Sequence, residues 1–371
     1  MSPVDRRLFT HFDWTLAGLA LTLFALGVVN LYSASGFRME EGLTLSSFYR
    51  KQLYWGIMGL GGMIAFLVFD YRHLRMLAWP LFLATVLALI ATLLWGKTIM
   101  GARRWLDLGL FHFQASEFAK ISLLILGAKL LSQDQGKLGW NQLLILGGIA
   151  LVPALLVLKQ PDLGSAITLL LILGGMIMYR GVHGAVLKVV LLVVPFLLPL
   201  GWHVLHDYQR QRILGFLDPT SDPLGAGYHI IQSQIAIGSG QMWGRGFLEG
   251  TQSQLRFLPE KHTDFALAVF GEEWGFIGCL ILLLLISLFL LSIVRTAAEA
   301  KDGFGCYLAV GVFFYFFWQI LINIGMVLGL MPVVGIPLPL ISYGGTSTMT
   351  SFCLIGLVLS VSMRRFFFKK N

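Results

Sequence analysis

Long runs of apolar residues, separated by polar segments, occupy the chain from residue 14 to residue 363. A run of roughly 20 apolar residues is long enough to cross the hydrocarbon core of a membrane as an α-helix. Ten segments meet or approach this length: 14–34, 53–69, 76–95, 116–132, 142–158, 164–179, 186–202, 265–294, 304–330 and 344–363. The pattern predicts an all-α polytopic membrane protein with about ten transmembrane helices, in which residues 1–371 form a single domain.

The amino-acid composition supports a membrane protein and excludes an ordinary soluble domain. The 371 residues are 57% hydrophobic and 12% charged, whereas a soluble domain has roughly 25% charged residues. In a soluble chain the net charge of +8 would suggest a nucleic-acid partner. Here we expect no nucleic-acid partner, because Lys and Arg accumulate in the cytoplasmic loops of membrane proteins.

The three cysteines give no sign of a metal or redox site. Cys279, Cys306 and Cys353 fall within predicted spans, where cysteine usually serves as a small packing residue. They form no CxxC motif and no Cys/His metal spacing.

The distribution of basic residues predicts the orientation. If the N-terminus lies in the cytoplasm, short cytoplasmic loops contain Arg72, Arg75, Arg180 and Lys301, as the positive-inside rule requires. Both termini are then cytoplasmic. The extracytoplasmic side receives the large loop 203–263, between the predicted helices 7 and 8.

The outer loops contain signs of ordered structure. Loop 203–263 includes many aromatic residues, and its segment 228–237 alternates apolar and amide residues like a short amphipathic helix at the membrane interface. Loop 331–343 is rich in proline and continues into Gly344 and Gly345. Irregular backbone at membrane depth is tolerated where protein buries it or where it lines a cavity. We therefore expect a cavity on the outer side.

Asp264 ends the long polar loop directly before an apolar segment. Ionisable groups at such positions are functional candidates. On a helix that starts there, the small residues Ala268 and Gly271 would share its face and could admit a ligand or a second helix. The alternative is a structural role, in which Asp264 interacts with the helix dipole and Thr263 caps the helix.

Three further acidic and basic positions lie at the predicted outer boundaries of the spans. Glu117 and Lys120 are three residues apart, so they can pair on one helix face or line a polar cavity that contacts an anion. Asp162 follows Gln160 and Pro161, where an ordinary polar turn is the alternative to a site.

Several arginines make the outer face basic. They are Arg103, Arg104, Arg210 and Arg212, and their guanidinium groups suit phosphate or pyrophosphate. For any single arginine, a solvated surface with salt bridges is the better explanation, and the concentration of arginines near the membrane is what favours a phosphate or pyrophosphate ligand.

Eight motifs, in order along nearly the whole chain, resemble the SEDS family (shape, elongation, division and sporulation). They are Tyr32 to Ser35, Arg104-Trp105-Leu106-Asp107, Gln114 to Lys120, Gln160-Pro161-Asp162-Leu163-Gly164, Asp207 to Arg212, Gly227 to Gly240, Gly250 to Asp264 and Pro332 to Gly345. His206 to Arg212 and Gly250 to Leu255 are more similar to the rod-shape branch than to the division branch. Ala115 departs from the pattern, which has proline there.

The resemblance implies a peptidoglycan glycosyltransferase of the bacterial cytoplasmic (inner) membrane, with its active site on the extracytoplasmic face. It would polymerise lipid II during cell elongation and release undecaprenyl pyrophosphate. Asp264 matches the essential aspartate of the family, and Glu117, Lys120 and Asp162 match other functional positions. The implied partners are a class B penicillin-binding protein transpeptidase and the elongation machinery.

The same resemblance leaves some chemistry open. Pyrophosphate departure needs cations, either basic loop residues or a divalent ion such as Mg²⁺ or Mn²⁺. We expect no organic cofactor. A lipid II flippase and a non-catalytic activator of a partner synthase are the alternative functions, since intramembrane charges suit a transporter as well.

Overall fold

The computed structural model describes residues 12–35, 48–99, 102–107, 109, 112–133, 136–189, 192, 207–218, 226–255, 257–258 and 260–365. Its helices are α1 (Trp14–Ala34), α2 (Phe48–Val68), α3 (Arg72–Trp95), α4 (Ala115–Leu131), α5 (Trp140–Lys159), α6 (Leu163–Arg180), α8 (Asp207–Leu217), α9 (Ala226–Ser239), α10 (Thr251–Gln254), α11 (Ala266–Ala298), α12 (Gly303–Val327) and α13 (Gly345–Met363). Among the described residues, eight helices are long and apolar enough to cross a membrane.

Nine of the ten predicted spans coincide with α1–α6 and α11–α13, to within a few residues. The remaining span, 186–202, lies largely outside the described residues. Helix α4 is not among the eight candidate spans, since it has only 17 residues and carries Glu117 and Lys120 in its first two turns.

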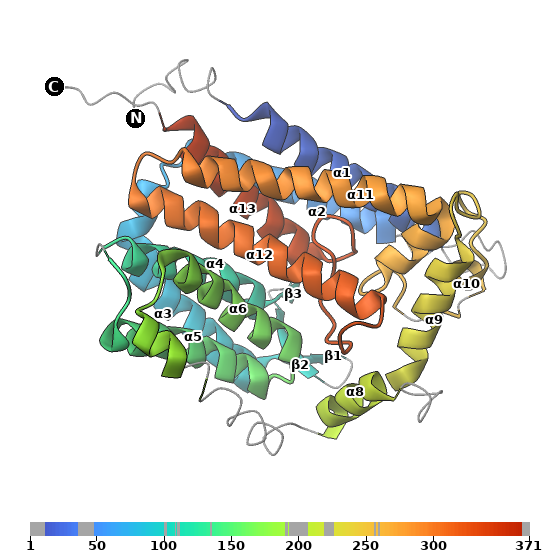
Figure 1. Ribbon diagram of the computed structural model, residues 1–371, viewed down its shortest axis with the longest axis horizontal. Coiled ribbons are helices and arrows are strands. Elements are labelled where there is room, and N and C mark those ends of the chain that lie inside the picture. Colours follow the sequence, from blue (N-terminus) through green and yellow to red (C-terminus); the bar gives the residue numbers. More distant parts are fainter. Residues whose placement is uncertain are drawn as a thin grey trace.

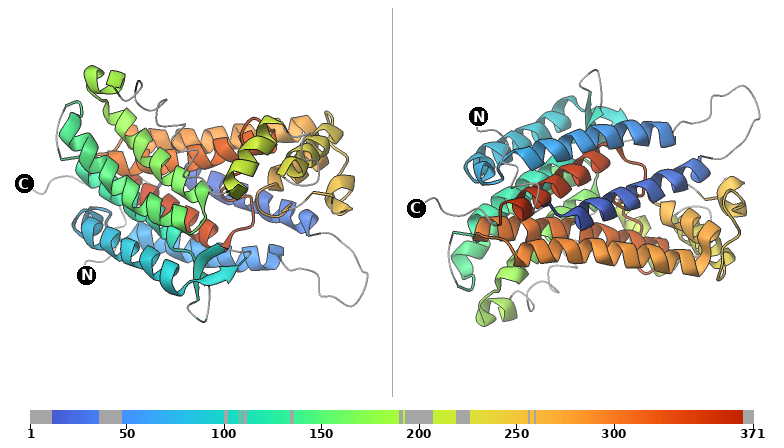
Figure 2. Two further views of the ribbon diagram at one scale, coloured as in Figure 1. Left: turned by 90° about the horizontal axis from the view of Figure 1, so that it is seen from below. Right: turned by 90° about the horizontal axis from the view of Figure 1, so that it is seen from above.

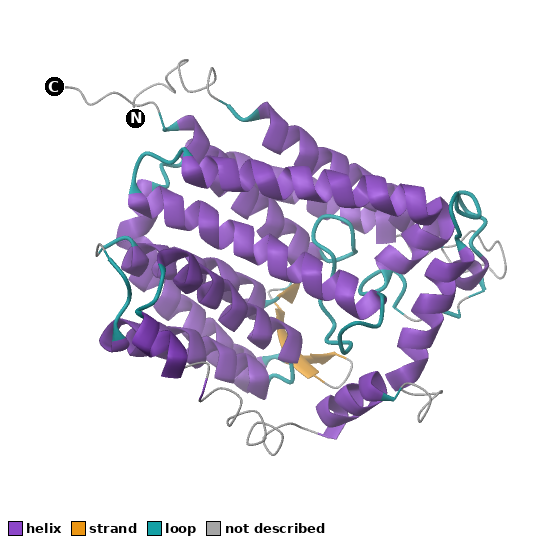
Figure 3. Cartoon of the chain, viewed as in Figure 1, coloured by secondary structure: helices purple, strands orange, loops and turns teal. Residues whose placement is uncertain are grey.

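The long helices run side by side, and the first described turn of α1 lies at the same end of the bundle as the last turn of α13 (Figures 1 and 2). Helices α8–α10, the β-strands and residues 328–344 lie toward the other end, which we call the loop end (Figure 3). One end of the bundle thus consists of short turns between helices, whereas the loop end also contains short helices, strands and a long irregular segment.

The core of the bundle lies around α4, α12 and α13. Most side chains of α4 and α13 are buried on all sides, as expected for helices enclosed by others. Helix α13 packs along α2. Small residues permit this close approach, because a Cβ at Gly356 would lie 2.4 Å from the carbonyl oxygen of Met63, and one at Gly59 would lie 2.7 Å from the Phe352 ring.

A small antiparallel sheet follows α3 in the segment that the sequence pattern assigned to a loop. Strands β1 (Lys97–Ile99), β2 (Ala102–Asp107) and β3 (His112–Phe113) have the order β1-β2-β3. The register pairs Thr98 with Arg103 and Leu106 with Phe113. Strand β2 contacts both α3 and α4 and so reaches the loop end of the buried helix.

The long polar loop is ordered where the structure describes it. The predicted amphipathic stretch 228–237 is helical and forms most of α9, which packs against α11 and α12. Helix α11 breaks at Gly275 (φ 66°), and backbone of residues 241–245, which precede α11 in the sequence, enters the break. There Arg245 N donates to Glu272 O at 3.0 Å, and Phe276 N donates to Gln241 O at 2.8 Å. On the predicted face of α11 that includes Ala268 and Gly271, a Cβ at Gly271 would lie 3.2 Å from the Ile237 side chain, so α9 covers this residue.

Candidate functional site

A polar cavity of about 460 Å³ lies at the loop end. Its walls come from β2, α4, α6, α8, α12, the turn 260–264 and the segment 334–347. Six of the residues predicted from the sequence line it: Arg104, Glu117, Lys120, Asp162, Arg212 and Asp264. Residues that are far apart in the sequence thus meet in one cavity.

Asp264 lies in the turn before α11, whose N-cap residue is Phe265. The predicted cap by Thr263 is wrong, because the Thr263 hydroxyl donates to the Glu260 carboxylate at 3.1 Å. Burial raises the pKa of Asp264 to about 6, and the nearby Glu260 charge adds to this, while Arg212 opposes it. A carboxyl group with this pKa is largely ionised at pH 7 and is still basic enough to accept a proton.

Glu117 and Lys120 form the predicted ion pair. Lys120 Nζ donates to Glu117 Oε1 at 2.5 Å, and both side chains are buried. The ammonium also lies 5.5 Å from the ring centroid of Tyr315. Glu117 Oε2 is buried and has no hydrogen-bond partner in the described part of the chain. The two residues therefore pair with each other and also line the cavity, while their contact with an anion stays a prediction.

Asp162 and Arg104 meet at the turn between α5 and α6. Asp162 Oδ1 accepts from Ser165 N at 3.1 Å and so caps α6, as an ordinary turn residue would. The Arg104 guanidinium donates to the carbonyls of Gln160, at 3.3 Å, and Pro161. Arg104 thereby ties β2 to the turn that places Asp162 at the cavity.

The four predicted arginines separate into two groups. Arg104 and Arg212 line the cavity, and Arg212 Nη1 donates to Val333 O at 3.1 Å. Arg103 is exposed on β2, and neither Arg103 nor Arg210 is among the residues that line the cavity. A substrate contact by Arg103 or Arg210 stays a prediction.

Sequence reasoning did not single out several cavity residues. They are Trp105, Gln114, Ser165, Thr168, Glu260, Gln319, Tyr343, Thr346 and Ser347. Gln319 had a detectable signal, because a buried amide in the middle of an apolar span requires a polar partner. Glu260 lies within the motif Gly250 to Asp264 but has no physical signal of its own, since it is an exposed acid in a polar loop.

The comparisons with known proteins cover nearly the whole chain. Residues 13–366 match the family model described as cell cycle protein, FtsW/RodA/SpoVE. The chain belongs to the FtsW/RodA/SpoVE family. It is 41% identical to peptidoglycan glycosyltransferase MrdB of Escherichia coli K12, over 97% of this chain and 96% of that protein.

Two solved structures extend this result to the fold of the FtsW/RodA/SpoVE protein. One is a chain from a peptidoglycan synthase complex that coordinates polymerisation and crosslinking, with a TM-score of 0.80 and 33% identity over 96% of this chain and 98% of that chain. The other is the rod shape determining protein RodA of Thermus thermophilus, with a TM-score of 0.71 and 30% identity over 96% and 98%. The chain is a multi-pass membrane protein of this fold.

The site of this FtsW/RodA/SpoVE protein offers proton-accepting and anion-binding groups from its own side chains. Among the described residues, no group of three or more His, Cys, Asp or Glu residues is placed to hold a metal ion. We therefore assign no ligand to a divalent cation, which the sequence analysis left as one alternative to basic residues. What the cavity combines is a carboxylate with a raised pKa, a guanidinium and an ammonium.

Proposed function

We propose that this protein is a peptidoglycan glycosyltransferase that polymerises lipid II into glycan strands during cell elongation and releases undecaprenyl pyrophosphate. The observation that carries the proposal is Asp264, a carboxyl with a pKa of about 6 at a polar cavity that also contains Arg212 and Lys120. The near full-length similarity to MrdB supports the same activity.

In the reaction a sugar hydroxyl of the acceptor attacks the anomeric carbon of the donor. The new C–O bond forms while the bond from that carbon to the pyrophosphate oxygen breaks. Asp264 accepts the hydroxyl proton, a role that requires its ionised form. The departing pyrophosphate takes the bonding electrons and gains negative charge, which Arg212 and Lys120 can stabilise. A Mg²⁺ or Mn²⁺ ion that arrives with the pyrophosphate would supply further positive charge.

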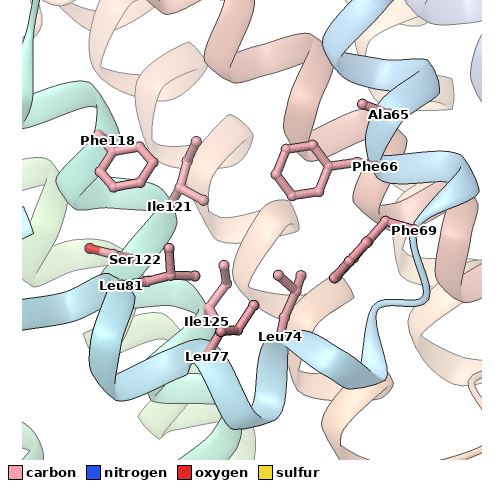
Figure 4. A pocket seen from close by; sticks show the side chains of 10 residues that line it. All are labelled: Ala65, Phe66, Phe69, Leu74, Leu77, Leu81, Phe118, Ile121, Ser122 and Ile125. Carbon is pink, nitrogen blue, oxygen red and sulfur yellow. The ribbon is translucent and has the colours of Figure 1, made fainter. Parts of the chain in front are cut away.

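An apolar groove suits the lipid part of this substrate. A second cavity, of about 270 Å³, lies between α2, α3 and α4, and Figure 4 shows Phe66, Leu74 and Ile121 among the side chains around it. Helix α4 contributes to both cavities, with Glu117 and Lys120 on the polar side and Ile121 on the apolar side. A sugar head group and a polyprenyl chain can therefore be held by different faces of one helix.

The proposal includes a location and partners. The distribution of basic residues supports a bacterial inner membrane protein with cytoplasmic termini and its polar cavity on the extracytoplasmic face. The similarity to a chain of a peptidoglycan synthase complex supports assembly with a class B penicillin-binding protein transpeptidase in the elongation machinery.

Purified protein supplied with lipid II tests the activity directly. We expect glycan polymers to form from the wild-type protein, in detergent or in liposomes, and we expect none from Asp264→Asn. Polymer formation only when a partner synthase supplies its own transferase would favour the activator alternative. Lipid II movement across liposome membranes without polymer would favour the flippase.

A further inference from the structure

Asn323 links two segments of the cavity wall that are far apart in the sequence. It is a buried residue of α12, near the end of that helix at Val327. Its Nδ2 donates to the carbonyl oxygen of Asp264 at 2.9 Å and to that of Ile336 at 2.8 Å. A side-chain amide has two N–H donors, and both are used here. The opposite orientation of the amide would place its oxygen against two carbonyl oxygens, so the hydrogen bonds determine the orientation.

The link holds the Asp264 carboxyl beside a glycine. Gly335 precedes Ile336, has a φ of +74°, and would place a Cβ 3.4 Å from Asp264 Oδ2 and 4.0 Å from Arg212 Nη1. Arg212 itself donates to the carbonyl of Val333 at 3.1 Å. The segment 333–336 is therefore held from two sides, by Arg212 and by Asn323, with the carboxyl group facing its glycine.

We propose that Asn323 is a positioning residue for the transfer reaction, because its two hydrogen bonds fix the Asp264 turn relative to the Gly335 backbone. The inference rests on the proposed function and adds to it a residue that does not touch the reacting atoms. Neither joined segment is regular secondary structure, whereas α12 is a long buried helix that can anchor both. A displacement of about 1 Å at a reacting group can reduce the rate roughly 100-fold.

The link also controls how much water reaches the carboxyl group. Burial is the largest cause of the raised pKa of Asp264; the charges of Glu260 and Asp162 raise the pKa further, and those of Arg212 and Arg104 lower it. If the two segments separate, water enters and the pKa of Asp264 falls toward its ordinary value. The fall of kcat on the acidic side of its pH profile, which we call the acidic limb, should then move to lower pH. A residue that only stabilises the fold would leave this limb in place.

The chain offers a matched control in Asn30. This residue is buried in α1, and its Nδ2 donates to the carbonyl of Ala266 at 2.8 Å. Asn30 and Asn323 also each have a buried Oδ1 that has no partner in the described part of the chain. The two amides thus have the same chemistry near the start of α11, but only Asn323 bonds to Asp264 and to the segment that contains Gly335.

The experiment compares Asn323→Leu, Asn323→Ser and Asn30→Leu with the wild type in lipid II polymerisation. Leucine keeps the approximate size and removes both donors, while serine keeps one donor. For Asn323→Leu we expect kcat to fall roughly 100-fold with KM within about threefold, and we expect an acidic limb at lower pH. Asn323→Ser should give a smaller fall in kcat and a smaller shift of the acidic limb in the same direction, and Asn30→Leu should lose thermal stability while keeping kcat within about threefold.

Three results would overturn the proposal. The first is an unchanged kcat in Asn323→Leu. The second is an equal loss of kcat in the two leucine variants at equal thermal stability. The third is an unshifted acidic limb in Asn323→Ser, which keeps the test valid if Asn323→Leu does not fold. A wild-type protein that forms no polymer would instead refute the proposed function, so the two failures are distinguishable.

Discussion

The two ends of the helical bundle both contain charged residues, but they use them differently. At the end opposite the loop end, the charges satisfy one another across short turns. Arg364 lies 3.8 Å from Asp70, and Arg295 donates to Glu299 at 2.9 Å. Asp302 caps α12 through Gly305 N, at 3.2 Å. Two of these contacts each lie at the end of a single helix, and the third joins the end of α13 to the turn after α2.

At the loop end, charged groups face a cavity. Glu117 has one bonded oxygen and one without a partner among the described residues, and Asp264 has a pKa that burial raises. Such an arrangement costs stability, because a buried polar group that lacks a partner loses its hydration. The difference between the ends indicates that the loop end is arranged to bind and react, whereas the other end is arranged to fold. Mutations should therefore affect activity at one end and stability at the other.

The largest expected effect is on activity alone, from Asp264→Asn. The amide keeps the shape of the side chain and removes the base, so polymerisation should fall by roughly 100- to 10,000-fold. Since the folded-state pKa of Asp264 is raised to about 6, its ionised form destabilises the fold as pH rises from about 4 to 6 and above. The variant should thus be as stable as the wild type at pH 7, or more stable. Activity near wild-type in the purified variant would exclude the general-base role.

A charge swap at Glu117 and Lys120 tests whether pairing and function are separable. Each single reversal places two like charges together in a buried site and should therefore lower the thermal stability of the protein. The double variant Glu117→Lys with Lys120→Glu restores the pair, so we expect thermal stability to recover. Activity should stay low, because the ammonium then stands at a different place in the cavity. Recovery of both properties would assign these residues to structure only.

Much of the fold was predictable because membrane helices leave a strong signal. Even α4, which is short and contains three charged residues, was predicted within a residue of its observed bounds. The sheet β1-β2-β3 was missed, because its short strands lie in the segment between α3 and α4 that the sequence pattern assigned to a loop. The break at Gly275 was also missed, since it depends on backbone from a distant loop that enters α11.

The site was predictable in its charged members and not in its geometry. Asp264 and Arg212 were found from their residue types and their position near a predicted boundary. The roles of Asn323 and Gly335 depend on distances between segments that are far apart in the sequence. Residue types alone also could not separate Arg212, which lines the cavity, from Arg210, which does not.

The difference in position between Arg212 and Arg210 gives the next prediction. Replacing both Arg210 and Arg212 with alanine should weaken lipid II binding more than it lowers stability, and Arg212→Ala alone should account for most of the loss. A charged hydrogen bond contributes about 1.5–3 kcal/mol, so the affinity should fall roughly 10- to 100-fold. Lysine at 212 should rescue only part of it, because an ammonium lacks the bidentate fork. Equal losses from the two single variants would remove the distinction between the arginines.

A smaller effect is expected from pH on the wild-type enzyme. With a pKa of about 6, Asp264 is mostly ionised at pH 7 and mostly protonated at pH 5. Turnover should therefore fall about tenfold between these values, since only the ionised carboxylate accepts the proton. Initial rates at saturating lipid II measure this limb, with thermal stability followed at each pH to separate it from unfolding. A flat profile from pH 7 to pH 5 would contradict the assignment.

The smallest effect on activity should come from the opposite end. Asp70→Asn removes the charge that faces the buried Arg364 guanidinium. Arg364 keeps its bonds to the carbonyls of Leu67, at 3.2 Å, and Val68, at 3.0 Å, so we expect a loss of only about 1 kcal/mol in stability. Turnover per folded molecule should stay within about twofold, because the change lies at the far end of the bundle from the cavity. Thermal unfolding and polymerisation, measured on one preparation, check both statements. A large loss of turnover without a loss of stability would show that the two ends are coupled, and the contrast between a folding end and a reacting end would then be wrong.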